Sequence, residues 1–183
     1  MRFLKTSFLI LTFLLAMPVM AFFAYDIFYF QPYSDEIKTI IANASPEDRN
    51  PPLLVQRLVR VSEPQGIERN LSRIIFYHLD TPRTRESAGQ RITKQVLWQL
   101  LFRLHLTEKE RMALYCSLVY TGNNDSGLST ASLRLFNKPL SELSASQAAT
   151  VVALTWGPRY YEKRPDALAE RRDLLLQRLS VGL

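Results

Sequence analysis

Hydrophobic and polar positions divide the chain into two regions. Residues 6–25 contain no charged side chain, and this run matches the ~20 residues that an α-helix needs to cross a bilayer. Beyond residue 30, apolar side chains recur every three or four positions, and no segment alternates with period two for long enough to predict a strand. The pattern therefore predicts an all-α protein, with a membrane-spanning N-terminal helix in residues 1–30 and a helical domain in residues 31–183.

The first region has two interpretations. Arg2 and Lys5 precede the uncharged run and Asp26 is the first charge after it, so the positive-inside rule places the N-terminus in the cytoplasm and exports the rest. Val19-Met20-Ala21 also fits a signal-peptide cleavage site. We predict a retained anchor and keep the cleaved signal as the alternative. Both place residues 31–183 outside the cytoplasmic membrane.

Start signals divide the second region into helices. Capping boxes at Thr107-Glu110 and Ser144-Gln147 each satisfy two backbone amides that the first turn of a helix leaves free. The residues after Ser144 are apolar on nearly all sides, which predicts a buried central helix. Residues 120–127, YTGNNDSG, predict a loop.

The predicted helices begin near Pro51, Ile67, Ile92, Thr107, Ser144 and Pro165. The last of these is predicted to point Leu168, Leu175 and Leu179 inward and Arg171, Arg172 and Arg178 outward.

Composition narrows the classes of function. The chain has 23 Lys and Arg against 17 Asp and Glu, a balance that suits an anionic membrane surface or a diphosphate-bearing ligand. The basic residues are spread over every helix and mixed with acids, which argues against nucleic acid as a partner. The single cysteine, Cys116, excludes an intramolecular disulfide and is predicted to be buried. The sequence contains neither a Gly-x-Ser-x-Gly turn nor a glycine-rich phosphate loop.

An ordered set of short motifs runs through the last part of the chain. It begins with LTEKERMALYCSLVYTG, residues 106–122. It continues at fixed intervals with Gly127, Phe136, Lys138, Glu142, Pro158, Tyr160, Pro165, Arg171 and Arg172. With these motifs, residues 107–179 resemble the second half of the peptidoglycan glycosyltransferase domain, the transglycosylase module of class A penicillin-binding proteins and monofunctional glycosyltransferases.

The resemblance implies a lysozyme-like α fold, anchored at the outer, periplasmic face of the bacterial inner membrane by its N-terminal helix. The family polymerises lipid II, a disaccharide-pentapeptide on a polyprenyl diphosphate. One glutamate acts as general base on the acceptor hydroxyl while cations hold the departing diphosphate. A sugar hydroxyl needs such a base, and the leaving diphosphate needs its charge neutralised. No cofactor is implied beyond the divalent metal that active members use.

Alignment with the family's basic motifs assigns four candidate ligand-binding residues. Counting back from Gly122, the family's "RK.KE" motif falls on Arg91-Ile-Thr-Lys94-Gln95, so the basic residues remain and a glutamine replaces the second glutamate. An amide hydrogen-bonds a ligand but does not act as a base. Further back, Arg73 falls on the family's phosphate-binding lysine. Arg83 or Arg85 stands near the next family arginine.

The motif that carries the family's principal glutamate is represented only by residues 54–63. Ser62 aligns with the glutamate and Glu63 with the aspartate after it, or Glu63 aligns with the glutamate after a shift of one residue. The chain then turns at Pro64, and the stretch that covers the family's donor site is missing. Glu63 is therefore either a catalytic base or an ordinary residue at the end of a helix.

Three hypotheses of function remain. In the leading hypothesis, the chain is a member of the family that acts in cell-wall biogenesis and has lost its catalytic carboxylates. It binds a polyprenyl diphosphate, a glycan strand or a cell-wall synthesis protein. The binding residues are Arg73, Arg91, Lys94 and Gln95. The second is an active, divergent glycosyltransferase that uses Glu63 as its sole base. The third is a helical assembly factor at the membrane whose cleft has no role.

Overall fold

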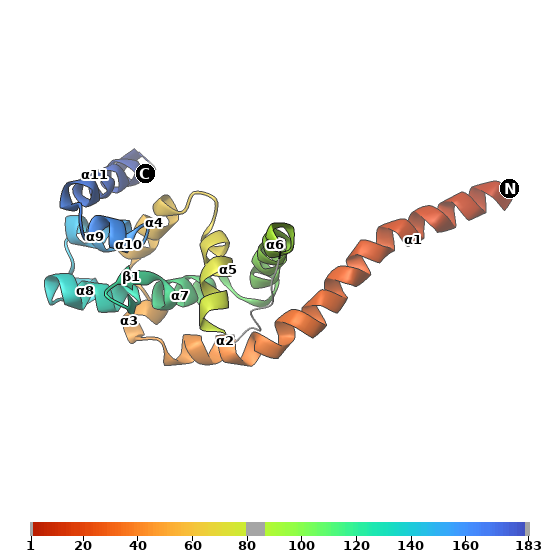
Figure 1. Ribbon diagram of the computed structural model, residues 1–183, viewed down its shortest axis with the longest axis horizontal. Coiled ribbons are helices and arrows are strands. Elements are labelled where there is room, and N and C mark those ends of the chain that lie inside the picture. Colours follow the sequence, from red (N-terminus) through yellow and green to blue (C-terminus); the bar gives the residue numbers. More distant parts are fainter. Residues whose placement is uncertain (1, 80–86, 182–183) are drawn as a thin grey trace. The chain divides into compact units, whose positions relative to one another are not determined.

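The computed structural model describes residues 2–79 and 87–181, and describes the backbone alone for residues 2–12 and 15. The chain forms two compact units, Met1–Glu36 and Ile37–Leu183 (Figure 1). Arg83 and Arg85, which the motif alignment singled out, lie outside the described residues.

The first unit is one continuous run of helix. α1 (Arg2–Tyr25) passes into a π-helical turn, η1 (Asp26–Phe30), and then into the start of α2 (Gln31–Asn43). In the described part of the chain, no helix combines the length and the apolar character that crossing a membrane requires. The predicted membrane-spanning helix is thus not confirmed, and several of its side chains, those of residues 6–12 and 15, lie outside the described ones.

In its described residues, the second unit contains helices and one two-stranded hairpin. Its elements are α3 (Pro46–Arg49), α4 (Leu53–Ser62), α5 (Ile67–His78), α6 (Ala88–His105), α7 (Glu108–Leu118), β1 (Tyr120–Gly122), β2 (Asp125–Ser126), α8 (Leu128–Phe136), η2 (Leu140–Glu142), α9 (Ala145–Leu154), α10 (Pro158–Tyr161) and α11 (Pro165–Val181). The predicted predominance of helix is confirmed.

Both predicted capping boxes are present. The backbone amide of Glu110 donates to Thr107 Oγ1 at 3.2 Å, and the amide of Thr107 donates to Glu110 Oε2 at 2.8 Å. Ser144 and Gln147 make the same pair of bonds at the start of α9. A third box, Ser87 with Gln90, begins α6 and was not predicted.

The predicted central helix, α9, is confirmed. Its residues from Ala148 to Leu154, with the exception of Thr150, are buried, and the helix packs against α4, α8 and α11 (Figure 1). Small side chains such as Ala148 and Ala149 let these neighbours approach closely. α9 therefore forms the middle of the core, and α4 and α11 pack against it and against each other.

The predicted loop at residues 120–127 is corrected to a short antiparallel hairpin, in which Tyr120 pairs with Ser126 and Gly122 with Asp125. Asn123 and Asn124 connect the strands with φ angles of 52° and 60°. Two consecutive residues in this left-handed region form the tight turn that matches the twist of a hairpin, and asparagine tolerates it well. The strands are too short to give an alternating pattern in the sequence.

One predicted helical face needs correction, and α6 buries only one of its two apolar sides. In α11, Leu175 is fully buried, but the guanidinium of Arg171 lies 4.0 Å from the ring centre of Trp156 and does not point outward. In α6, Trp98, Leu101 and Phe102 enter the core. Ile92, Val96, Leu100 and Leu104 are exposed, because this helix carries apolar residues on two sides and only one side packs on α5.

Candidate functional site

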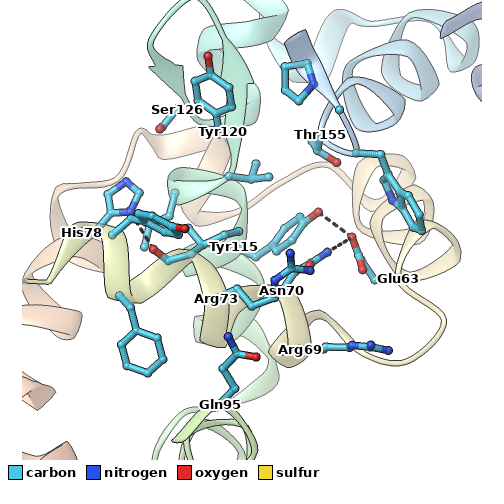
Figure 2. A pocket seen from close by; sticks show the side chains of 18 of the residues that line it. Glu63, Arg69, Asn70, Arg73, His78, Gln95, Tyr115, Tyr120, Ser126 and Thr155 are labelled. Carbon is cyan, nitrogen blue, oxygen red and sulfur yellow. Dashed lines mark hydrogen bonds between the residues drawn. The ribbon is translucent and has the colours of Figure 1, made fainter. Parts of the chain in front are cut away.

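A cavity of about 1520 Å³ opens between α5, α6, the end of α7, the hairpin and the connection from α9 to α10 (Figure 2). All five site residues predicted from the sequence line it. They are Glu63, Arg73, Arg91, Lys94 and Gln95. Ser62, the alternative to Glu63 in the motif alignment, is fully buried and does not line the cavity. The structure therefore brings together residues from two helices and from the turn after α4, which the motif alignment had linked only by spacing.

Glu63 is held in a fixed position at the inner end of the cavity. Its Oε1 accepts hydrogen bonds from Asn70 Nδ2 at 2.7 Å and from the Tyr115 hydroxyl at 3.2 Å, and Figure 2 shows both side chains converging on the carboxylate. Burial raises the pKa of Glu63 above its usual value. The two hydrogen bonds and the charges of Arg171 and Arg73 lower that pKa only in part. A carboxylate with a raised pKa accepts a proton more readily near neutral pH.

The turn between α4 and α5 places Glu63 where it is. Glu63 is the C-cap of α4, and Pro64 follows it, so the helix does not continue. Gly66 has φ +92°, and a Cβ there would come within 2.6 Å of a carboxylate oxygen of Glu68. The positive φ, which residues with a Cβ rarely adopt, favours glycine in this tight turn. The turn lets Asn70, one turn into α5, point back to the Glu63 carboxylate.

Tyr115 anchors Glu63 to the core. It is almost fully buried on α7, and its pKa is raised strongly, first by burial and then by the neighbouring charge of Glu63. The phenol therefore stays protonated and acts as a hydrogen-bond donor. Neither Tyr115 nor Asn70 was predicted as a site residue. Their only sequence signal was their place within the family motifs.

Basic side chains dominate the outer walls of the cavity. The basic lining residues are Arg69, Arg73, Arg91, Lys94 and Arg159, and Glu63 is the one acidic lining residue in the described part of the chain. The ammonium of Lys94 lies 4.5 Å from the centre of the Phe76 ring, a cation–π contact. Gln95 adds an amide that donates and accepts hydrogen bonds. This arrangement suits a ligand with more than one negative charge.

Trp156 borders the cavity beside Glu63. Its Nε1 donates to Ser62 Oγ at 2.9 Å, and Arg171 stacks on its ring. The ring remains 54% exposed. Ser62 and Arg171 together fix the plane of the indole, so the cavity has a rigid aromatic surface next to its carboxylate.

The residues that the structure describes include no group of three or more His, Cys, Asp or Glu side chains placed to hold a metal ion. Cys116, predicted to be buried, is buried on α7. Burial raises the pKa of its thiol, so the thiol is a poor nucleophile or ligand. The described lining of the cavity supplies one carboxylate, its two hydrogen-bond donors and the basic walls.

Comparisons with known proteins agree with the motifs. The family model described as Transglycosylase matches residues 67–180. Penicillin-binding protein 1A of Aquifex aeolicus is 32% identical over 98 residues, which cover 52% of this chain. Penicillin-binding protein 1F of Bacillus subtilis is 28% identical over 95 residues. The biosynthetic peptidoglycan transglycosylase of Thiobacillus denitrificans is 30% identical over 86 residues.

These matches cover 13% to 37% of the relatives' own lengths. Arg73, Arg91, Lys94 and Gln95 fall within the stretch that the family model matches, and Glu63 lies just before it. The stretch also contains α5 to α10 and nearly all of α11, from which most of the cavity is built. Because the match extends over more than half of its residues, the chain belongs to the transglycosylase family.

Proposed function

We propose that the cavity binds the diphosphate of a polyprenyl-linked sugar used in peptidoglycan synthesis, such as lipid II, and that the chain does not polymerise it. The observation that carries the proposal is the charge of the cavity walls, where five basic side chains face one carboxylate among the described lining residues. Arginine and lysine make short, charge-assisted hydrogen bonds to phosphate oxygens. Arg73, Arg91 and Lys94 hold the diphosphate, and Gln95 hydrogen-bonds it or the first sugar.

Two departures from the family motifs support the absence of polymerisation, the missing donor-site stretch after Pro64 and the replacement of the second glutamate by Gln95. The resemblance places a glutamate at this position, and the amide cannot take a proton from a hydroxyl or return one. Glu63 is then left as a single carboxylate, tied by its hydrogen bonds to Asn70 and Tyr115. In this proposal Glu63 orients the acceptor side of a bound sugar without driving its transfer.

Titration of the full chain in detergent with lipid II tests the binding. Each charge-assisted bond contributes ~1.5–3 kcal/mol, so Arg91→Ala or Lys94→Ala weakens binding by about 10- to 100-fold. Arg178→Ala and Lys138→Ala are matched controls, since both side chains are exposed and do not line the cavity. Inorganic diphosphate competes in the same titration. Equal affinities for all four variants contradict the proposal.

The second candidate function is an active glycosyltransferase with Glu63 as its sole base. The observation in its favour is that the Glu63 carboxylate lines the cavity and has a raised pKa. Labelled lipid II with a divalent cation separates the two candidates. Glycan chains that form with the unaltered protein and vanish with Glu63→Gln support the enzyme. Bound lipid II that stays unpolymerised supports the binding protein.

We also propose that the first unit anchors the chain in the bacterial inner membrane, with residues 31–183 on the periplasmic side. Support comes from the uncharged residues 6–25 and from the basic residues before them. Extraction of cell membranes with alkaline carbonate tests the anchor, which predicts that the chain stays with the lipid. Release into the supernatant contradicts it. Accessibility of a cysteine introduced at Leu133 to an impermeant reagent reports the side of the membrane.

A further inference from the structure

The outward face of α6 carries four exposed aliphatic side chains. Ile92, Val96, Leu100 and Leu104 follow one another at intervals of four residues, so they lie on one side of the helix. They are 61%, 50%, 48% and 57% exposed, while Trp98, Leu101 and Phe102 on the other side are buried. Single exposed aliphatic residues are ordinary, but four in register on one helix mark a surface that contacts something apolar.

The charges of α6 are all basic. Between Ala88 and His105 the helix carries Arg91, Lys94 and Arg103 and has no aspartate or glutamate. Arg103 is paired with Glu68 of α5 at 3.4 Å. α11, a helix of similar length, carries both signs of charge. An apolar helical face combined with exclusively basic charges is the pattern of helices that lie in the plane of an anionic membrane surface.

We propose that the outward face of α6, defined by Ile92, Val96, Leu100 and Leu104, lies in the surface of an anionic bilayer. In this position the aliphatic side chains enter the boundary between headgroups and acyl chains, and the basic side chains remain at the level of the lipid phosphates. This inference rests on α6 alone and does not depend on the proposed ligand of the cavity.

The same observations argue against two other occupants. Protein interfaces concentrate their energy in Trp, Tyr and Arg, whereas the four residues of this face are all aliphatic. A second copy of the chain would bring one wholly basic helix against another, and like charges in an interface are repulsive. Anionic lipid supplies both an apolar layer and the complementary charge.

The position has a consequence for the cavity. Arg91 and Lys94 belong to α6 and line the cavity. When α6 lies in the membrane surface, the wall of the cavity that these two residues form lies at the level of the lipid headgroups. Phosphate groups that are attached to a lipid tail lie at that same level. A ligand then enters the cavity without leaving the bilayer surface.

The test uses the full chain reconstituted in vesicles of equal parts phosphatidylcholine and phosphatidylglycerol. Val96→Cys and Leu100→Cys are each labelled with the fluorophore NBD, and Leu133→Cys on α8 is the matched control, since Leu133 is 54% exposed. Cys116 is buried, so the introduced cysteine is the accessible one. Circular dichroism verifies that each labelled chain is folded, and Ile92→Cys replaces any variant that is not.

We expect NBD at positions 96 and 100 to emit at shorter wavelength than at position 133, to lose its quenching by aqueous iodide and to be quenched by nitroxide-labelled lipid. Omitting phosphatidylglycerol should reduce these shifts, because the positively charged helix then meets no negatively charged headgroups. Equal emission and iodide quenching at positions 96, 100 and 133 would overturn the proposal. So would protection from iodide without quenching by nitroxide-labelled lipid, since a protein surface would then cover the face. Dependence of that protection on the protein-to-lipid ratio would identify the occupant as a second copy.

Discussion

The two ends of the cavity are built differently. At the inner end, the Glu63 carboxylate is held by Asn70 and by the buried Tyr115. At the outer walls, Arg69, Arg73 and Arg91 are exposed side chains that extend from α5 and α6. One end is part of the folded core, and the other consists of solvated charges that a ligand would order. Changes at the inner end should therefore alter stability, whereas changes at the outer walls should alter binding.

The largest expected effect separates these two ends directly. Tyr115→Ala removes a nearly fully buried aromatic side chain, and truncations of this kind lower the free energy of unfolding by ~3–5 kcal/mol. Arg73→Ala at the outer wall should change it by less than ~0.5 kcal/mol. Chemical denaturation of both variants measures the difference. Similar losses in the two variants would remove the distinction between a core end and a solvated end.

A smaller effect is expected when only the hydroxyl of Tyr115 is removed. Tyr115→Phe keeps the packing but takes one donor from the half-buried Glu63 carboxylate, which costs ~1–3 kcal/mol of stability. The pKa of Glu63 should rise further, because a hydrogen bond that favours its charged form is lost. Denaturation and NMR titration of the Glu63 side chain measure the two effects. An unchanged pKa would show that Tyr115 does not stabilise the carboxylate.

The pH dependence of stability provides a third test. Because the pKa of Glu63 is raised in the folded chain, the folded state binds more protons than the unfolded state between the two pKa values. The free energy of unfolding therefore falls as the pH rises from about 4.5, the ordinary pKa of a glutamate, to the higher pKa that Glu63 has in the folded chain. Glu63→Gln should remove this contribution and flatten thermal unfolding temperatures over that interval. An identical pH profile for both chains would contradict the raised pKa.

The smallest expected effect concerns Arg171. Arg171→Ala removes the stacking on Trp156, worth ~0.5–1 kcal/mol where a cation is partly exposed. It also removes a positive charge that lowers the pKa of Glu63, so that pKa should rise. Arg178→Ala, on the same helix and exposed, is the matched control. Equal effects of the two substitutions on the Glu63 titration would show that Arg171 does not act on the carboxylate.

Local signals made much of the fold predictable. The capping boxes at Thr107 and Ser144 depend on residues three positions apart, so the sequence contains the whole interaction. The apolar composition after Ser144 was enough to predict the central helix. The face of α6 was not predictable, because apolar residues lie on two of its sides and only the packing of α5 decides which side is buried.

The candidate site also has a part that the sequence could predict and a part that it could not. Motif spacing was sufficient to select Arg73, Arg91 and Lys94, which the structure brings to one cavity. The bond between Tyr115 and Glu63 joins residues 52 positions apart, and the stacking of Arg171 on Trp156 depends on how α11 packs. Such contacts form only in the folded chain. No pattern along the sequence indicates them.

The most direct test of the account is the affinity of the full chain for lipid II when both Arg91 and Lys94 are replaced by alanine. If the basic wall holds the diphosphate, the double variant should bind more weakly by well over tenfold, while its unfolding free energy stays within about 0.5 kcal/mol of the original. Arg178→Ala combined with Lys138→Ala should bind as the unaltered chain does. Unchanged affinity in the Arg91 and Lys94 double variant would contradict the central claim that this cavity is an anion-binding site.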